Sequence, residues 1–537
     1  MLYRAFLYLI SIFLLLAGNT CFSQNENSKW YFGNQAGLDF MTNPPGILTN
    51  GVINTFEGCS GISDAAGNLL FYTDGITVWN SSHTMMSNGG LLNGNSSTSQ
   101  AAVVVKQPGN PSIYFIFTLA CCTNATGVNY SVVDMSLSSG SGSVTIKNVS
   151  LAGNSQEKLT SVRHCNGTDI WVLSQAYPSG DFRAHLVSAA GVSTTPVMSA
   201  IGSNTATGAT YVGYMKFSPN GKKLGVAVCN SSLMGFDLYD FDASTGIVSN
   251  RVPLVTSTLA YGVEFSPDGT KMYGALWGGP RLYQWDLCAG SGTAIVASQY
   301  TTATSGGGAL QLGINGKIYM TRSGQSWMGV VANPNVGGSG CNYSDNGQSI
   351  SPKINSWGLP NFITSGFKSP PIPFTHTLTS CQTASFTAPP IVQNYTLTGC
   401  AASGYSLMGI QWNFGDPLTG SSNTSTLSNP THIYSGLGTY TSQLVLYYSC
   451  GGGTDTIKQV VNINQPCISV SSTSITCANL GSATVQATGG IGPYSYTWTP
   501  GGQISPVATG LSPGIYSIAV FDQGNNFTYT ATTLFTS

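Results

Sequence analysis

The sequence predicts an all-β protein, with an N-terminal β-propeller of about seven blades followed by two small β modules. Only 7% of the 537 residues are charged while 66 are glycine, a composition poor in helix formers and rich in turn and strand formers. Turn motifs also recur at a similar interval along the first two thirds of the chain. At this length two to four domains are expected, because single cores stop growing at about 250–300 residues.

The first 23 residues have the three-part pattern of a secretory signal. Arg4 precedes an apolar run from Ala5 to Ala17, and a polar stretch follows before Gln24. The run is shorter than the about 20 apolar residues of an ordinary membrane-spanning helix, and no second long apolar run follows. We expect export and a mature chain from Gln24. A lipid anchor at Cys21 is the less favoured alternative, because the three residues before it are atypical of such a site.

Charge and cysteine usage argue against two kinds of site. The net charge is −1 and the lysines and arginines form no stripe, so a nucleic-acid or other polyanion partner is not expected. Beyond Cys21 the chain has an even set of twelve cysteines, and an exported chain is expected to form some disulfides. No Cys-x-x-Cys pair occurs, and the adjacent His164 and Cys165 are interpreted as a buried strand pair rather than as zinc ligands.

A unit of one turn and one strand repeats from about Trp30 to Phe367. Its clearest copies contain Phe-Ser-Pro-Asn-Gly ending at Gly221 and Phe-Ser-Pro-Asp-Gly ending at Gly269, and the next turn glycine is Gly316, so these glycines lie 48 and 47 residues apart. Three weaker copies come earlier in the chain, with turn glycines at Gly67, Gly109 and Gly167. The six turn glycines are therefore spaced at intervals of 42 to 58 residues. A period of about 40–50 residues is that of a four-stranded propeller blade.

The local chemistry of the repeat favours the same fold. Asn-Gly and Asp-Gly suit the positive φ angles of a tight hairpin, and the strand after Gly221 alternates apolar residues. The segment Trp30 to Gly33 can complete a blade with residues near Trp357 to Ile363, so we expect six to eight blades and choose seven, within residues 24–370. The Phe-Ser-Pro-Asp-Gly-Thr-Lys stretch resembles the repeat of bacterial TolB and lactonase-like propellers, a resemblance that implies the fold and no catalytic group.

A proline-rich joint from Ser369 to Pro373 predicts a domain boundary, because proline cannot continue a strand ladder. The next segment, 377–465, has three marks in order, namely Trp412-Asn-Phe-Gly-Asp416, Pro430-Thr-His432-Ile-Tyr434 and Gly438-Thr-Tyr440. These marks resemble the PKD domain, an immunoglobulin-like sandwich of extracellular proteins. Asn413 and Pro417 depart from the family pattern, which puts an ion in that turn in doubt. We interpret Trp412 as core, Asp416 as a turn former and His432 as a hydrogen-bonded partner.

Residues 466–537 form a third predicted module. Its marks in order are Thr476-Cys477, Gly481-Ser-Ala-Thr-Val485, Pro493-Tyr-Ser-Tyr-Thr-Trp498, Pro513-Gly-Ile-Tyr516 and Asp522-Gln-Gly524. Tyr494, Tyr496 and Trp498 share one face in strand geometry. The marks resemble the SprB repeat of surface adhesins in the Bacteroidetes group. That family commonly has a cysteine where this chain has Asn525, so Cys477 is expected to pair elsewhere, with Cys467 as one option, or to stay reduced.

The search for chemistry commits to no catalytic, cofactor-binding or metal residue. Gly510-Leu-Ser512-Pro-Gly514 matches a nucleophile elbow only in letters and is interpreted as a turn. Four acids at blade ends could meet in space and pair for glycoside cleavage; they are Glu57, Asp64, Asp74 and Glu264. The segments 56–64 and 71–75 are the best place for such a site, although turn formation and satisfied hydrogen bonds are their favoured interpretation. Four tryptophans could stack on sugars but are more simply blade-packing residues; they are Trp79, Trp277, Trp285 and Trp327.

Together these features predict a secreted or cell-surface, non-catalytic binding or adhesion protein. The propeller is the expected interaction head, and the two small modules are a stalk or adhesive units. The protein is expected outside the cell or on the outer face of the outer membrane, with an extracellular glycan or a surface protein as ligand and no cofactor. The competing prediction is a secreted carbohydrate-active hydrolase or lyase with its active site in the propeller channel, which converging acids there would favour.

Overall fold

The structure is a computed structural model. It describes residues 24–120, 127–202, 212–229, 234–256, 258–367, 373–389, 407–448, 454–464, 467–473, 475, 479–489, 492–524 and 527–536. The secretory signal predicted at residues 1–23 lies outside this set. The described residues divide into two compact units, one up to Phe367 and one from Pro373, and each is described by itself.

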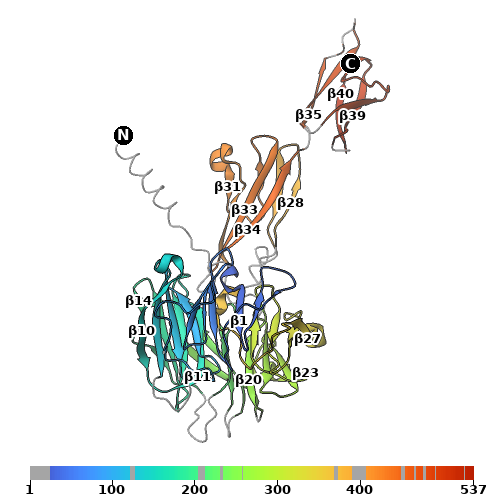
Figure 1. Cartoon of the computed structure of the whole chain (residues 1–537). Helices are drawn as coiled ribbons and strands as arrows, with labels where there is room; N and C mark the ends of the chain where they lie inside the picture. The colour runs from blue at the N-terminus through green and yellow to red at the C-terminus, as the bar shows by residue number, and fades with distance from the viewer. Residues whose placement is uncertain are drawn as a thin grey trace. The chain divides into compact units, whose positions relative to one another are not determined.

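The first unit contains seven antiparallel sheets that follow one another along the chain (Figure 1). Their strands are β1 (Lys29–Phe32), β2 (Ala36–Asp39) and β3 (Gly46–Leu48); β4 (Ser60–Ser63), β5 (Leu69–Thr73) and β6 (Val78–Asn80); β7 (Ala102–Lys106), β8 (Ile113–Leu119), β9 (Val128–Asp134) and β10 (Ser143–Ala152); β11 (Ser155–Arg163), β12 (Ile170–Ala176), β13 (Phe182–Ser188), β14 (Gly191–Val192) and β15 (Val197–Ser199); β16 (Met215–Phe217), β17 (Lys223–Val228), β18 (Gly235–Asp242) and β19 (Ile247–Thr256); β20 (Ala260–Phe265), β21 (Lys271–Leu276), β22 (Arg281–Asp286) and β23 (Tyr300–Ala303); and β24 (Leu310–Leu312), β25 (Ile318–Met320), β26 (Trp327–Val331) and β27 (Tyr343–Ser349).

Short helices lie before, between and after these strands. They are the 3₁₀ helices η1 (Gln24–Asn27), η2 (Ser138–Gly140), η3 (Gly338–Cys341) and η4 (Thr364–Phe367), and the six-residue helix α2 (Gly292–Ala297).

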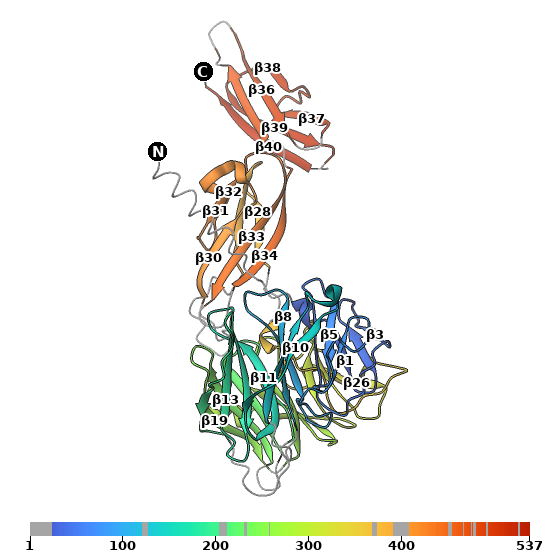
Figure 2. The same cartoon turned by 60° about the vertical axis from the view of Figure 1, so that its left-hand side comes forward.

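The seven sheets close into a ring. The first strand of each sheet packs against the first strand of the next sheet, in the order β1, β4, β7, β11, β16, β20 and β24. The last sheet returns to the first: the rings of Trp30 and Tyr319 are 5.6 Å apart, and Asn34 forms a bridge with Ile354. Strand β1 accordingly lies beside the strands of the last sheet in both views (Figures 1 and 2). The first unit is therefore a seven-bladed propeller, as the repeat predicted.

The turn glycines of the repeat have the backbone that the sequence required. Gly221, Gly269 and Gly316 have φ values of 70°, 71° and 77°, a region that favours glycine. The residue before the glycine has a different role from the one expected. Asn220 and Asp268 do not take a positive φ; instead, their Oδ1 atoms accept backbone N–H groups of Lys222 and Thr270 at 3.1 and 2.9 Å.

The second unit contains two sandwiches of two sheets each, and both were predicted as small β modules. The first is built from β28 (Thr375–Leu378), β29 (Thr383–Thr387) and β32 (Thr431–Ile433) facing β31 (Thr424–Ser425), β30 (Leu407–Asn413), β33 (Gly438–Tyr448) and β34 (Thr454–Ile463), with the 3₁₀ helix η5 (Pro417–Asn423). The second is built from β35 (Cys467–Thr473), β36 (Gly481–Thr488) and β38 (Val507–Leu511) facing β37 (Tyr494–Thr499), β39 (Gly514–Asp522) and β40 (Phe527–Phe535).

Each sandwich has a tryptophan at its centre. Trp412 and Trp498 are fully buried, within clusters drawn from both sheets of their module. Along β37, Tyr494, Tyr496 and Trp498 point inward while the residues between them are exposed. The inward set is the one that strand geometry predicted.

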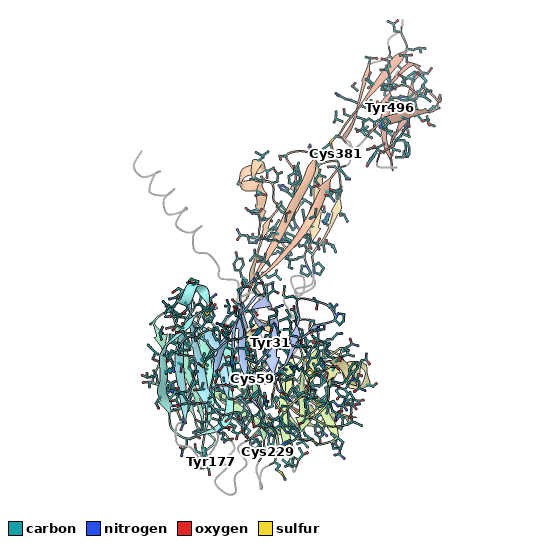
Figure 3. All side chains as sticks on the ribbon, in the orientation of Figure 1. Tyr31, Cys59, Tyr177, Cys229, Cys381 and Tyr496 are labelled. Carbon is teal, nitrogen blue, oxygen red and sulfur yellow. A yellow bond between two sulfur atoms is a disulfide. The ribbon has the colours of Figure 1, made fainter. Side chains whose placement is uncertain are left out.

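The expected disulfides form, but Cys467 has a different partner from the one considered. Cys467 is bonded to Cys381 (labelled in Figure 3), and Cys165 is also in a disulfide. Cys477 and Asn525 lie outside the described residues. Cys381 lies in the turn between β28 and β29, and sequence spacing gave no sign that this turn would meet the start of β35. No helix within the described part of the chain is long and apolar enough to cross a membrane.

Candidate functional site

The central channel of the propeller is filled by the chain itself. The segment 357–367 follows the last blade and passes along the inner strands, with parallel bridges from Pro360 to Cys59 and from Ile363 to Ser161. Cys59 is labelled in Figure 3. The prediction that residues near Trp357 to Ile363 complete a blade with Trp30–Gly33 was therefore wrong, because Lys29–Phe32 pairs with β2 in a sheet of its own. The bridge to the first blade is made earlier, at Ile354, and the residues after it turn into the channel.

Asn361 is the central residue of this segment and is 1% exposed. Its Nδ2 donates to the carbonyl oxygens of Ala102 and Leu159 at 3.3 and 2.6 Å. Its backbone N–H donates to the carbonyl of Cys59, and its own carbonyl accepts from Ser60 Oγ at 2.7 Å. One side chain and its peptide groups thus join the inner strands of three blades.

Two further blades, the fifth and the seventh, hold the segment at its start. The carbonyl of Trp357 accepts from the N–H of Ala309 and from Thr321 Oγ1 at 3.0 and 2.9 Å. The N–H of Leu359 donates to Tyr214 Oη at 3.1 Å. Gly358 also approaches a neighbouring backbone so closely that a Cβ would lie 1.9 Å from the carbonyl oxygen of Glu57. The channel is therefore a packed interior.

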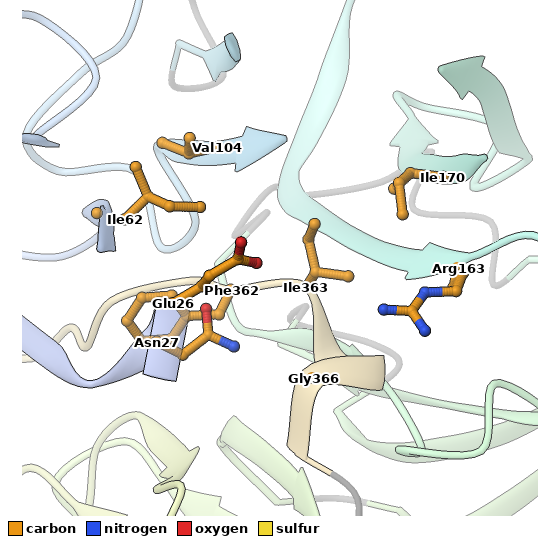
Figure 4. A pocket seen from close by; sticks show the side chains of 10 residues that line it. Glu26, Asn27, Ile62, Val104, Arg163, Ile170, Phe362, Ile363 and Gly366 are labelled. Carbon is orange, nitrogen blue, oxygen red and sulfur yellow. The ribbon is translucent and has the colours of Figure 1, made fainter. Parts of the chain in front are cut away.

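The two ends of the channel differ in chemistry. The inner strands finish at the end called the Glu26 end, where η1 and η4 lie. A small cavity of about 20 Å³ is found there, with room for about one water molecule. Glu26, Arg163 and Ile363 line it (Figure 4). Burial raises the pKa of Glu26, although Lys106 at 3.8 Å and Arg163 act in the opposite direction.

The opposite end, called the Glu57 end, holds a buried acid beneath exposed aromatic side chains. Glu57 is 1% exposed, and its Oε1 accepts from Tyr261 Oη at 2.8 Å. Burial and the nearby Glu157 raise the pKa of Glu57 to about 8, against the effect of the Tyr261 hydrogen bond. The preceding residue, Phe56, is 50% exposed, and its carbonyl accepts from the N–H of Trp357.

Glu157 is the second acid at this end and was not among the acids predicted from the sequence. Its Oε2 accepts from both the backbone N–H and Oγ of Ser99, at 2.8 and 2.9 Å. Ser99 Oγ in turn accepts from the N–H of Gly213 at 2.9 Å. Glu157 lies in the interior of a strand with no turn motif beside it, so no sequence pattern distinguished it from a surface acid.

The Glu57→Gln variant is expected to remove a pH dependence of stability. The folded chain keeps a proton on Glu57 that the unfolded chain releases above about pH 4.5. The stability that this group contributes is therefore fully present below pH 4.5, and up to about 5 kcal/mol of it is lost as pH rises to about 8. Urea unfolding at about pH 5, 7 and 9 measures this slope.

The control for this prediction is Asp64→Asn, at an exposed turn, which should leave the slope above pH 5 unchanged. Glutamine keeps an acceptor for Tyr261 Oη, so the Glu57→Gln variant should fold. Equal slopes in the wild type and the Glu57→Gln variant would contradict the raised pKa.

The four acids singled out in the sequence have different partners. Burial acts to raise the pKa of Asp64, but the hydrogen bonds it accepts in a turn, including those from the N–H groups of Ala66 and Asn68, together lower it below its usual value. Asp74 is buried, which raises its pKa, and it accepts from the N–H groups of the next turn. Glu264 lies inside the channel wall, where its main charged neighbour is Lys216. The interpretation of Asp64 and Asp74 as turn formers agrees with these bonds.

The four tryptophans singled out in the sequence fall into two groups by their position in the propeller. Trp285 is fully buried among Tyr283 and Phe236, and the Trp79 ring stacks on Tyr72 at 5.5 Å, so both are packing residues. The other two lie at the Glu57 end. Trp277 contacts Tyr261 and Trp357 with ring centroids 5.9 and 6.0 Å away, and Trp327 is 41% exposed. Trp357 was not among the sequence candidates.

Two other sequence interpretations are settled by the structure. His164 and Cys165 are not a strand pair, because both follow the end of β11 in a turn where the N–H of Asn166 donates to His164 Nδ1. The disulfide of Cys165 also removes its thiolate as a metal ligand. Within the described residues, no group of three or more His, Cys, Asp or Glu could hold a metal ion. Ser512 lies in the turn between β38 and β39, as expected.

The marked residues of the first sandwich have structural roles. Asp416 accepts from the N–H and Oγ of Ser435, both at 2.6 Å, and its Oδ2 lies 3.5 Å from His432 Nε2. Both side chains are nearly fully buried. Asp416 thus ties the turn after β30 to the end of β32, which is more than the turn formation assigned to it.

Comparison with known proteins finds one family match. Residues 469–503 match the SprB repeat. The match covers the first half of the module that the sequence marks had assigned to the SprB repeat. The SprB repeat is typical of surface-associated proteins. No curated protein sequence matches the chain.

Solved structures similar to this chain are distant. Hydrazine synthase of Kuenenia stuttgartiensis has 14% identity and a TM-score of 0.40, covering 57% of this chain and 93% of its own. A candidate 6-phosphogluconolactonase of Bacteroides fragilis has 10% identity and a TM-score of 0.35, covering 61% and 88%. A protein of Lactobacillus plantarum has 12% identity and a TM-score of 0.34, covering 70% and 96%. The propeller assignment depends on the sheet order of this chain and not on these similarities.

Proposed function

We propose that this chain is a cell-surface, non-catalytic binding or adhesion protein in which the propeller is the interaction head. The observation that carries the proposal is the filled channel, where Asn361 joins inner strands of three blades. Enzymes with a catalytic propeller channel need that channel open to substrate. Here recognition is left to the outer faces of the ring, and the SprB repeat supports a place at the cell surface.

The Glu57 end is the recognition face in this proposal. Phe56 and Leu259 are each 50% exposed there, and Trp277 and Trp357 are partly exposed beside them. Clustered exposed aromatic side chains are typical of binding surfaces. The first described residue, Gln24, and the helix η4 both lie at the opposite end, the Glu26 end.

An extracellular glycan is the ligand we favour. Only 7% of the residues are charged and the net charge is −1. The chain therefore offers few charged side chains for ion pairs with a strongly charged polymer. The faces of aromatic rings are flat and apolar, so the apolar faces of sugar rings can stack on them. The PKD-like and SprB-type modules then act as a stalk or as further adhesive units.

A glycan array with the purified chain tests the proposal, with hydrolysis assays on every glycan that binds. Trp277→Ala and Phe56→Ala should each weaken binding at least about tenfold, the loss typical of a buried contact residue. Leu91→Ala is the matched control, because Leu91 is 82% exposed but lies in the connection between β6 and β7. Binding that survives both aromatic substitutions would place recognition elsewhere.

The second candidate function is a secreted carbohydrate-active hydrolase or lyase. Its support is Glu57, whose pKa of about 8 suits a proton donor and whose charge interacts with that of Glu157. Turnover of a bound glycan by the wild type, lost in Glu57→Gln without loss of binding, would favour this enzyme over the binding protein.

A further inference from the structure

Three consecutive blades place a polar or charged side chain in the channel at the same point of the repeat. Lys216, Glu264 and Gln311 each lie five residues before the turn glycine of their blade, in the inner strands β16, β20 and β24. Their side chains are 0%, 2% and 1% exposed. The repeat therefore brings an amine, a carboxyl and a carboxamide together in a site closed to bulk water.

The amine and the carboxamide are in direct contact across the ring. Lys216 Nζ donates to Gln311 Oε1 at 2.5 Å. Gln311 Nε2 donates to the carbonyl of Leu312 at 3.0 Å, which fixes the plane of the amide. Glu264 is held beside this amide, because its Oε2 accepts from the N–H of Leu312 at 2.9 Å. The carboxyl comes from β20, the strand that lies between the two strands of the contact.

The protonation states in this site suit a reaction between amine and amide. A lysine ammonium has three donors to satisfy, yet among the described residues Gln311 is the one hydrogen-bond acceptor of Lys216 Nζ. Burial lowers the pKa of Lys216, against the opposing effects of Glu264 and Cys59. Burial likewise raises the pKa of Glu264, against the effect of Lys216. Both shifts favour a neutral, nucleophilic amine near a protonated carboxyl.

We propose that Lys216 and Gln311 become joined by an intramolecular isopeptide bond. Nζ of Lys216 attacks Cδ of Gln311 and forms the new N–C bond. The bond from Cδ to Nε2 breaks, and Nε2 leaves as ammonia. Nζ loses one proton, and the leaving nitrogen gains one. The Glu264 carboxyl carries the proton between these two nitrogen atoms. The reaction consumes no oxidant, metal or nucleotide, and exclusion of water protects the amide from hydrolysis.

The bond would add a covalent link between two blades that are not neighbours. Lys216 and Gln311 are 95 residues apart in sequence and belong to the fifth and seventh sheets. A cross-link over such a long loop restricts the unfolded chain strongly. A propeller head exposed at a cell surface would then resist unfolding even where disulfides are reduced.

Mass spectrometry of the wild-type chain tests the proposal directly. After reduction and alkylation, trypsin should fail to cut at the acylated Lys216, and peptide 184–222 should be linked to peptide 282–317. The linked pair should weigh less than the sum of the two peptides by one ammonia, about 17 Da. Recovery of the two peptides unlinked, with cleavage after Lys216, would overturn the proposal without any variant having to fold.

Two variants test the assigned roles. Lys216→Arg removes the nucleophile, and under reducing, denaturing electrophoresis it should migrate more slowly than the internally linked wild type. Glu264→Gln keeps both reacting residues and should leave most chains unlinked. Glu57→Gln, a change at another buried channel glutamate, is the matched control and should remain linked. Full linkage in Glu264→Gln would overturn the role of the carboxyl, and equal migration of Lys216→Arg and wild type would overturn the bond.

Discussion

Replacement of Asn361 by alanine is expected to lower the free energy of unfolding of the propeller by about 3–5 kcal/mol. The Asn361 amide donates to the carbonyl oxygens of Ala102 and Leu159, and alanine would leave both buried without this donor. Each buried acceptor left unsatisfied costs about 1–3 kcal/mol, and the lost side-chain volume adds to this. Urea unfolding, followed by tryptophan fluorescence, measures the change.

The matched control is Asn333→Ala, which removes an exposed amide that donates to Gly340 in the last blade. Its effect should stay within about 0.5 kcal/mol of the wild type. An Asn361→Ala variant as stable as this control would show that the ring does not depend on the channel segment. It would also remove the main support for a binding protein over an enzyme, because a weakly held segment could leave the channel to a substrate.

The blades were predictable because each one is specified locally. The Ser-Pro-Asn-Gly and Ser-Pro-Asp-Gly turns fix a positive φ at Gly221 and Gly269, and the strands that follow, β17 and β21, are buried from their second residue onward. The six turn marks with the unpaired Trp30 segment gave seven blades, and seven sheets are present. Information that lies within about ten residues was enough for this part of the fold.

The channel segment could not be predicted, because its partners are spread over the whole ring. Residues 357–363 contain Gly358 and Pro360 and show no strand alternation, so the sequence suggested only a closing strand. Asn361 bonds to residues about 200 to 300 positions away, in strands that become neighbours only when the ring is complete. No spacing rule connects such residues.

The candidate acids illustrate the same limit. Asp64 and Glu57 looked alike in sequence, since both stand at the end of a probable strand. The structure exposes Asp64 in a turn and buries Glu57 against Glu157, which belongs to another blade. Lys216, Glu264 and Gln311 occupy equivalent positions in the sequence repeat, because each lies five residues before a turn glycine. Their approach across the channel could not be predicted, because it depends on closure of the ring.

The Cys381→Ser/Cys467→Ser double variant is expected to lower the free energy of unfolding of the first sandwich by about 4–5 kcal/mol. The disulfide joins residues 86 positions apart, so the loop that it closes contains nearly the whole module. In the chain-entropy description, most of this loss comes from the greater freedom of the unfolded chain. Both cysteines are replaced so that a released Cys467 thiol cannot pair with another cysteine, such as Cys477. Urea unfolding without reductant measures the effect.

Reductant provides the control for this prediction, because it should destabilise the first sandwich of the wild type and leave that of the double variant nearly unchanged. Trp412 reports on this module, since it is fully buried and packs on Phe374 at 4.9 Å. A double variant within about 1 kcal/mol of the oxidised wild type would mean that the bond serves mainly to fix β35, which begins at Cys467, to the turn after β28. In that case reduction should leave both sandwiches folded and change only the link between them, so the same titration distinguishes a bond that stabilises the module from one that only connects it to its neighbour.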